Sequence, residues 1–138
     1  MYKFLFILLL FVPGAHADEA EIPIFDSVPI KYTQKNWIRN SVGEKIWIEN
    51  EMQVGDFTDK KMKFYVYITG SNYHQCSASG EAEKLSKTTY RFKEDACNLL
   101  IKFTRDYITL SDKGNTCKVS YCGNNAYFDK AEFFKVEK

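Results

Sequence analysis

Four cysteines are the residues in this sequence whose chemistry is easiest to constrain. They are Cys76, Cys97, Cys117 and Cys122, and four residues separate the last two in "NTCKVSYCGNNAYF". Closely spaced cysteines serve as zinc ligands, redox pairs or structural disulfides. A zinc site is expected to show a C-x2-C knuckle or histidines at ligand spacing, and a thioredoxin-like redox pair shows C-x-x-C. The chain has neither pattern, so we predict two structural disulfides.

The pairing of the cysteines follows from an expected hairpin. The segment "CNLLIKFTRDYITLSDKGNTC" has the pattern of two strands with a turn between them, which would place Cys97 beside Cys117. Cys76 would then tie an earlier strand to Cys122. We prefer the pairs Cys76–Cys122 and Cys97–Cys117, and the two other connectivities of four cysteines stay open.

Other catalytic patterns are missing from the sequence. It contains no G-x-S-x-G, H-E-x-x-H or glycine-rich phosphate loop. A Ser–His–acid triad would need His74 in "GSNYHQC", which we interpret as a hydrogen-bonded structural histidine. Glu81 and Glu83 occupy alternate positions and would share one face of a strand, which we expect to face solvent. We therefore predict that the protein is not an enzyme and uses no metal and no cofactor.

Tyrosines suggest a contact surface instead. The chain has nine of them, and tyrosine offers a large rigid ring with a polar tip, so it is enriched at interfaces. Most are expected to pack in a sheet. Tyr73 and Tyr121 are different, because each lies close to a cysteine that would hold it in place. A contact residue that is ordered in advance loses less entropy when it binds.

The first 17 residues have the pattern of a secretory signal peptide. "MYKFLFILLLFVPGAHA" has one early charge, an apolar run over 4–12, and small residues before the expected cleavage point. Nine apolar residues cover roughly half of a bilayer core, so we do not expect a membrane anchor. We predict an exported protein that is not inserted in a membrane after cleavage.

The charge balance of the mature chain narrows the choice of partner. The full chain has 19 Lys and Arg against 18 Asp and Glu, and the signal peptide holds one of the basic residues, Lys3. Removing it leaves 18 against 18, a net charge of zero. A neutral chain offers no electrostatic footprint for nucleic acid. We expect a protein partner, and a chain that is a monomer or a weak dimer.

The cysteines must be positioned by strands. Residues 18–43 carry two prolines and no sustained period, and we interpret them as an extended N-terminal arm with a short helical turn near 35–39. From 44 to 138 alternating segments such as "MKFYVYIT" recur between turn signals, with turns expected near 86–87, 105–106 and 129–130 and a strand over "KVSYCG". This regular spacing of strands and turns predicts an all-β domain cross-linked by two disulfides. It would be a small antiparallel barrel or a curved sheet or meander.

The residues over about 69–135 resemble a known family. "NYHQCSASGEAE", "TYRFKEDACNLLIKF" and the closing "CKVSYCGNNAYFDKAEFFK" are similar to small exported bacterial proteins related to periplasmic lysozyme inhibitors, the C-type-inhibitor and LprI-like groups. The resemblance implies a β-barrel or curved sheet that inserts a loop into the substrate cleft of a muramidase.

These observations give an expected function and site. We expect a non-enzymatic protein-binding domain of the periplasm or the exterior, most concretely a lysozyme inhibitor. The expected partner-binding residues are an insertion loop of Ser79, Gly80 and Glu81, with Tyr121, Gly123 and Asn124 on the adjoining edge. Gly123 would form a plain turn after the disulfide, or serve a positive φ or a close approach by the partner. The alternatives are an immunity or host-facing protein that binds another partner, and a structural accessory domain of the envelope docked through residues 18–43.

Overall fold

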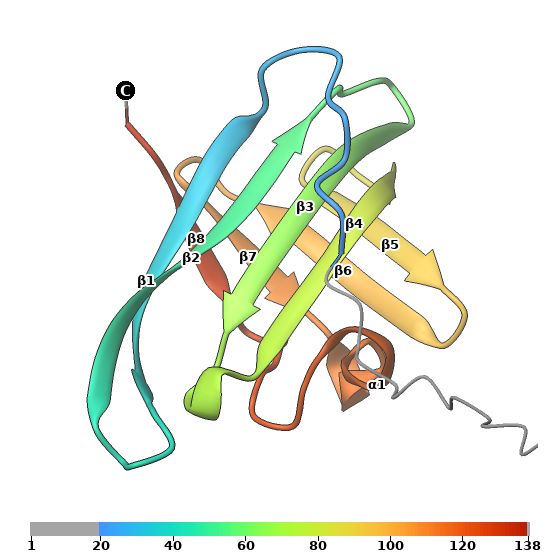
Figure 1. Cartoon of the computed structure of the whole chain (residues 1–138). Helices are drawn as coiled ribbons and strands as arrows, with labels where there is room; N and C mark the ends of the chain where they lie inside the picture. Colours follow the sequence, from blue (N-terminus) through green and yellow to red (C-terminus); the bar gives the residue numbers. More distant parts are fainter. Residues whose placement is uncertain (1–19, 138) are drawn as a thin grey trace, which may run out of the picture.

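The chain folds into a closed antiparallel β-barrel. A computed structural model describes residues 20–137, so the expected signal peptide over 1–17 lies outside the described residues. Each strand pairs with its neighbours in sequence, and the last strand closes the ring against the first (Figure 1). The strands are β1 (Ile30–Arg39), β2 (Lys45–Gly55), β3 (Lys61–Thr69), β4 (Gln75–Lys84), β5 (Thr89–Glu94), β6 (Cys97–Phe103), β7 (Tyr107–Ser111) and β8 (Glu132–Lys135). The prediction of a small all-β antiparallel barrel is confirmed.

The alternation of apolar residues along each strand explains which side chains point into the barrel. Phe64, Val66 and Ile68 of β3 point into the barrel and are buried, as the alternation in "MKFYVYIT" predicts. The expected turns near 86–87, 105–106 and 129–130 all fall between strands. Local alternation and turn residues therefore define most of the barrel.

The first strand corrects the prediction of an extended arm over 18–43. Residues 30–39 form β1, which pairs with β2 along its whole length and with β8 through Tyr32 and Thr33. The expected helical turn at 35–39 is therefore wrong. Tyr32 and Ile38 are buried on one side of β1. Between them, the positions on that side hold Gln34 and Asn36, so the apolar period is interrupted.

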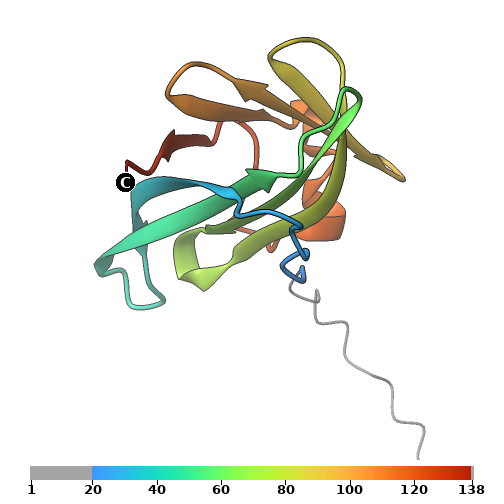
Figure 2. The same ribbon diagram turned by 90° about the horizontal axis from the view of Figure 1, so that it is seen from above.

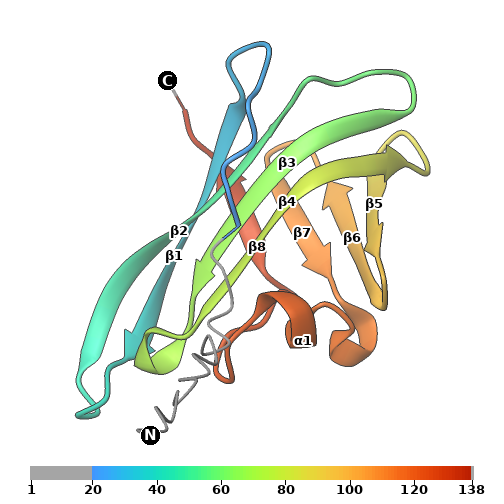
Figure 3. The same cartoon turned by 45° about the vertical axis from the view of Figure 1, so that its right-hand side comes forward.

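Residues 20–29 remain extended, and we call them the N-terminal strap. The strap runs across the outer faces of β3 and β4 (Figures 1 and 3). The N–H of Ala20 donates to Ser77 Oγ, and Lys63 Nζ donates to the carbonyl of Ile24 at 3.0 Å. Further along, the N–H of Asp26 donates to the Asp56 carboxylate at 2.8 Å. The strap is thus fixed to the barrel by hydrogen bonds at both of its ends.

Two disulfides cross-link the second half of the chain, in the predicted pairs. They join Cys76 to Cys122 and Cys97 to Cys117. The strand expected over "KVSYCG" is instead a one-turn helix, α1 (Lys118–Tyr121). The four residues between Cys117 and Cys122 make about one helical turn. Helix α1 thus lies between Cys117 and Cys122, which belong to different disulfides. It sits at one end of the barrel, below β4 and β5 in Figure 1.

Aromatic rings fill much of the core. Phe64 and Phe92 meet edge to face with their ring centroids 5.0 Å apart, and Phe103 contacts both Tyr32 and Tyr90. Burial of one such side chain stabilises the fold by about 1.5–3 kcal/mol. The largest fully buried side chains also include Phe128, Phe133, Met52, Met62 and Leu99. Seen from above, the strands surround this core (Figure 2).

Candidate functional site

The expected insertion loop at Ser79, Gly80 and Glu81 is not a loop. These residues lie within β4 and pair with Tyr65, Phe64 and Lys63 of β3. A side chain at Gly80 would place its Cβ 3.2 Å from the ring of Phe92, and Gly80 has a φ of +152°. Gly80 therefore makes room for a ring inside the barrel. The prediction of a loop at 79–81 is wrong.

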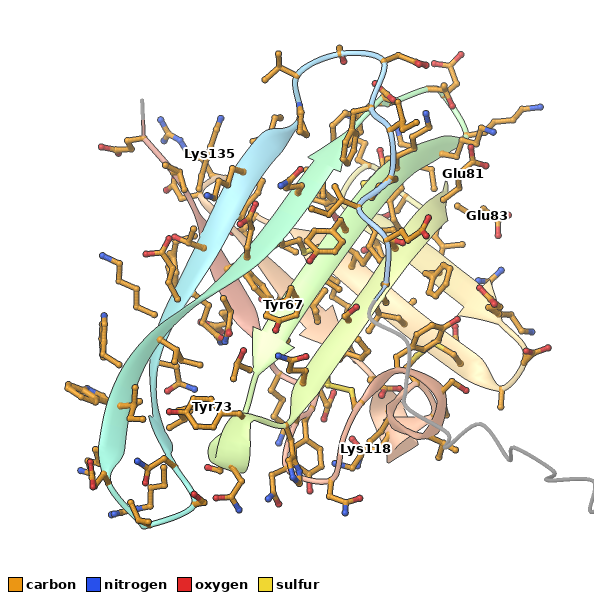
Figure 4. All side chains as sticks on the ribbon, viewed as in Figure 1. Tyr67, Tyr73, Glu81, Glu83, Lys118 and Lys135 are labelled. Atoms are coloured by element: carbon orange, nitrogen blue, oxygen red, sulfur yellow. A yellow bond between two sulfur atoms is a disulfide. The ribbon has the colours of Figure 1, made fainter. Side chains whose placement is uncertain are left out.

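The carboxylates of this segment lie on the outer surface. Glu81 and Glu83 are exposed while Ala82 between them is buried, as expected for one solvent face of a strand. Glu81 pairs with Lys61 at 2.9 Å and Glu83 with Arg91 at 3.1 Å. Exposed pairs of this kind contribute little stability. Both side chains lie at the same end of β4 in Figure 4.

Tyr121 and its neighbours lie at the other end of β4. Cys122 bridges to Cys76, which stands five residues before Glu81, or roughly 17 Å along an extended strand. Figure 4 accordingly shows Lys118 of α1 far from Glu81. The two groups of expected contact residues therefore do not form one continuous edge.

Tyr121 is held against the barrel. Its ring meets Phe92 edge to face at 6.0 Å. Burial, together with a hydrogen bond to Glu94, raises the pKa of Tyr121 to about 12. Because the phenol is partly buried and packed, it helps to close the end of the barrel beside α1.

Gly123 serves a close approach within the chain. It is not among the residues with positive φ, so one of its expected roles, the positive φ, is wrong. A Cβ at Gly123 would lie 3.2 Å from Cβ of His74. Nδ1 of His74 accepts the backbone N–H of Asn125 at 2.9 Å, as expected for a hydrogen-bonded histidine.

The loop that contains Asn124 is held by one ammonium group. Lys118 Nζ donates to the carbonyls of Gly123, Asn124 and Ala126 at 3.3, 2.7 and 3.0 Å. The same ammonium lies 3.4 Å from the ring centroid of Tyr127, a cation–π contact. With these partners, Lys118 orders the loop over 122–127.

A more prominent surface feature is the hairpin of β1 and β2. β2 pairs with β1 from Lys45 to Val54 but with β3 only from Glu51 to Gly55. Residues 36–48, which we call the projecting hairpin, therefore extend past the end of β3 as a two-stranded ribbon (Figures 1 and 3). The inward side chain Ile38 is buried, and β1 contacts the short 3-10 helix η1 (Ser71–Tyr73).

Two tryptophans face each other on the outer side of this hairpin. Trp37 and Trp47 are direct cross-strand partners, and their ring centroids are 4.8 Å apart with the planes at 63°. They are 58% and 50% exposed. The sequence prediction missed this pair, although the segment "NWIRNSVGEKIWIEN" repeats Trp-Ile on both sides of a turn that contains Gly43.

The base of the hairpin is fixed by a buried amide. Asn50 is 1% exposed, and its Oδ1 accepts the N–H of Thr69 at 2.8 Å while its Nδ2 donates to Gln34 at 2.9 Å. One side chain thus joins β1, β2 and the end of β3. The projecting hairpin is anchored to the barrel, and the indole pair has a defined position.

Within residues 20–137, no group of three or more His, Cys, Asp and Glu side chains could hold a metal ion. No helix of this part of the chain is long and apolar enough to cross a bilayer.

The fold defines this chain as a small, disulfide-linked, up-and-down β-barrel protein. Comparison with known proteins gave no matching family model, no similar curated protein and no similar solved structure. The resemblance to lysozyme inhibitors therefore stays a prediction from the sequence.

Proposed function

We propose that this protein is an exported, non-enzymatic binding domain that contacts a protein partner through the projecting hairpin. The observation that carries the proposal is the pair Trp37 and Trp47, half exposed and packed against each other on an anchored ribbon. Tryptophan is the side chain most enriched among residues that dominate binding energy at protein interfaces.

The order of the hairpin supports this role. The indole rings contact each other before any partner arrives, and Asn50 fixes the base of the ribbon. Binding through such a surface loses little side-chain and loop entropy, so more of the contact energy appears as affinity. A soluble domain rarely leaves two adjacent tryptophans half exposed without a contact to make.

The disulfides support an exported location for the protein. Two disulfides agree with an oxidising, exported environment. We place the protein in the periplasm or in the secreted fraction, following the signal-peptide pattern of residues 1–17.

The most concrete version of this function is lysozyme inhibition. The sequence resemblance supplies the partner class, and the projecting hairpin supplies an element that is narrow enough to enter a cleft. In this proposal the hairpin replaces the segment 79–81 as the inserting element, because those residues lie within β4. Immunity and host-facing proteins would use the same surface on another partner. A structural envelope role through residues 18–43 is less favoured, because 30–39 belong to the barrel.

The test is the inhibition of c-type, g-type and i-type lysozymes by the purified mature protein. A reduced and alkylated sample serves as the control for the fold. Inhibition of one class that is lost on reduction would support the proposal. If no class is inhibited, lysozyme is the wrong partner. Capture of one protein from the native envelope by the wild type, and not by Trp37→Ala/Trp47→Ala, would then keep the binding role of the hairpin.

A further inference from the structure

The ribbon formed by β1 and β2 has an edge without a neighbouring strand. β1 pairs with β2 through all of its residues, but its ladder with β8 ends at Thr33 and Phe134. On the side away from β2, residues 34–39 of β1 therefore have no partner strand in the part of the chain that the structure describes. We call this stretch the open edge. It is about as long as an ordinary strand, so it can accept one more strand.

The seam with β8 shows which backbone groups face the open edge. The N–H of Val136 donates to the carbonyl of Lys31 at 3.0 Å, so the odd-numbered residues of β1 direct their backbone groups away from β2. The same alternation applies further along the strand. It directs the backbone groups of Lys35, Trp37 and Arg39 to the open edge.

One of these groups already has a substitute for a partner strand. The N–H of Trp37 donates to Oδ1 of Asn36, its neighbour in sequence, at 2.9 Å. Within residues 20–137, the backbone N–H groups of Lys35 and Arg39 have no such partner on this side. All four residues are exposed. An added strand would therefore meet free backbone groups at both ends of the stretch, and it would displace one amide side chain in the middle.

There is space beside the open edge. A cavity of about 230 Å³ lies between β1 and the segment 125–131. Gln34 and Asn36 line it from β1, and Tyr127 and Lys130 line it from the segment. Because this segment leads into β8, the neighbour of β1 at the seam, the cavity lies on the side of the open edge.

The side chains along the open edge are mainly basic. Lys35 and Arg39 stand on either side of Trp37 at alternate positions, so the three share the outer side of the ribbon. In the described part of the chain neither cation forms an ion pair. On β2, Lys45 lies opposite Arg39 and Glu49 lies opposite Lys35. Three cations and one carboxylate give this side of the hairpin a net charge of +2.

This charge favours an acidic strand over a second copy of the chain. Two copies joined through their open edges would form one continuous sheet with both outer sides together, each with a charge of +2. Pairing about Trp37 would also place Lys35 of one copy opposite Arg39 of the other, and like charges destabilise a strand pair. Lysine on an edge strand commonly prevents such pairing between copies. Carboxylates at the same positions would instead be attracted.

We propose that the open edge takes up an extended acidic segment of the protein partner as an added strand. Backbone hydrogen bonds to β1 would hold the segment, and its alternate side chains would lie along the outer side of the ribbon. Two carboxylates would lie beside Lys35 and Arg39, and an apolar side chain between them would pack on Trp37. The partner sequence that fits is acidic-x-apolar-x-acidic. This inference rests on the proposed function, because it takes the hairpin as the contact surface, but it does not require that the partner is a lysozyme.

The experiment uses the synthetic peptide Thr-Glu-Thr-Val-Thr-Glu-Thr, at concentrations up to the millimolar range, with the disulfide-intact mature protein. One control peptide has Lys in place of Glu. A second control peptide keeps every side chain but carries methyl groups on alternate backbone nitrogens, so it cannot form the ladder. Tryptophan fluorescence reports on the hairpin alone, because the two tryptophans of the chain are Trp37 and Trp47. Amide exchange followed by NMR locates the contact.

Two sets of variants separate the backbone from the charge. Lys35→Pro removes an N–H that faces the open edge and leaves the ladder with β2, because proline is tolerated where the N–H of an edge strand faces solvent. Its control, Lys35→Gln, removes only the cation. The charge variant is Lys35→Glu/Arg39→Glu, and Lys87→Glu/Lys93→Glu makes the same change of charge on exposed residues elsewhere. Circular dichroism and thermal unfolding check the fold of each variant.

We expect the acidic peptide to bind the wild type and to protect the amides of Lys35 and Arg39 from exchange. Lys35→Pro and the charge variant should weaken binding at least about tenfold, and Lys87→Glu/Lys93→Glu less than about threefold. Lys35→Gln should weaken binding less than Lys35→Pro.

Three results would overturn this inference. They are no binding of the acidic peptide, equal binding of the methylated peptide, and a dimer of the wild type that Lys35→Pro dissociates, which would assign the open edge to a second copy. Each would leave the proposed function standing. The proposed function fails separately, if no lysozyme is inhibited and Trp37→Ala/Trp47→Ala captures the same envelope proteins as the wild type.

Discussion

Asn50 accepts a hydrogen bond from the backbone N–H of Thr69 across 2.8 Å, and this bond joins the base of the projecting hairpin to the end of β3. The same amide donates to Gln34, so its oxygen and its nitrogen both have partners inside the protein. This side chain therefore helps to fix the position of the indole pair relative to the barrel.

Asn50→Ala should lower the free energy of unfolding by about 1–3 kcal/mol, because a buried backbone N–H and a buried amide lose their partner. Urea unfolding measures the loss, and hydrogen exchange should show faster opening in the hairpin than in β5 to β7. The control is Asn98→Ala on the exposed side of β6, for which we expect a change within about 0.5 kcal/mol. Equal losses in both variants would contradict an anchoring role for Asn50.

Acid should release the N-terminal strap. The backbone N–H of Asp26, followed by Lys63 and Ser27, lowers the pKa of Asp56 to about 2. A carboxylate with a lowered folded-state pKa stabilises the fold above its unfolded pKa, and this contribution is lost as the pH falls through the folded value. We therefore expect the strap to loosen between about pH 4 and pH 2, seen as faster proteolysis within 20–29 by an acid-active protease. Asp56→Asn should remove most of this pH dependence, and a profile identical to that of the wild type would refute the assignment.

The disulfides should differ in their effect on stability. They close segments of 20 and 46 residues, and by the chain-entropy argument they contribute about 3 and about 4 kcal/mol. Cys76→Ser/Cys122→Ser should therefore lower the free energy of unfolding more than Cys97→Ser/Cys117→Ser. Denaturant titration of the two double variants, with mass spectrometry to confirm the remaining bond, makes the comparison. The reverse order would show that native contacts near α1 outweigh the chain entropy.

Gly70 should tolerate a side chain less well than Gly123. A Cβ at Gly70 would lie 2.0 Å from the carbonyl oxygen of Asn125, so the backbone must move, whereas a Cβ at Gly123 meets His74 at 3.2 Å. Forced overpacking costs about 1–3 kcal/mol. Thermal unfolding of Gly70→Ala should show the larger drop in Tm, and a Tm unchanged from the wild type would show that the loop over 122–127 can move away.

Much of the barrel could be predicted from local patterns. Alternation in β3, turn residues and the spacing of the cysteines led to the strands and to both disulfide pairs. These features depend on neighbours close in sequence. The strand β1 was missed because Gln34 and Asn36 interrupt its inward apolar side. They occupy the stretch where β1 leaves the barrel. The sequence does not reveal that the hairpin of β1 and β2 extends beyond the end of β3.

The contact surface was harder to predict. The insertion loop at 79–81 was expected from the resemblance, but these residues belong to a strand in which Gly80 makes room for Phe92. That requirement comes from the side chain of Phe92 on the next strand, β5, and the sequence alone does not show that this ring packs over Gly80. The pairing of Trp37 with Trp47 could be inferred from their nearly symmetric positions about one turn, once β1 is recognised as a strand. Their exposure follows only from where β3 ends.

The closing seam of the barrel has a consequence for the maturation of the protein. β1 and β8 lie near opposite ends of the described chain, yet they are adjacent in the ring and pair through only two residues of each. Contacts so distant in sequence form late in folding. A chain that crosses a membrane with its N-terminus first would hold β1 with one unpaired edge until β8 emerges. Such an edge can pair with another unfinished chain, so the yield of native protein should fall as the concentration of unfinished chains rises.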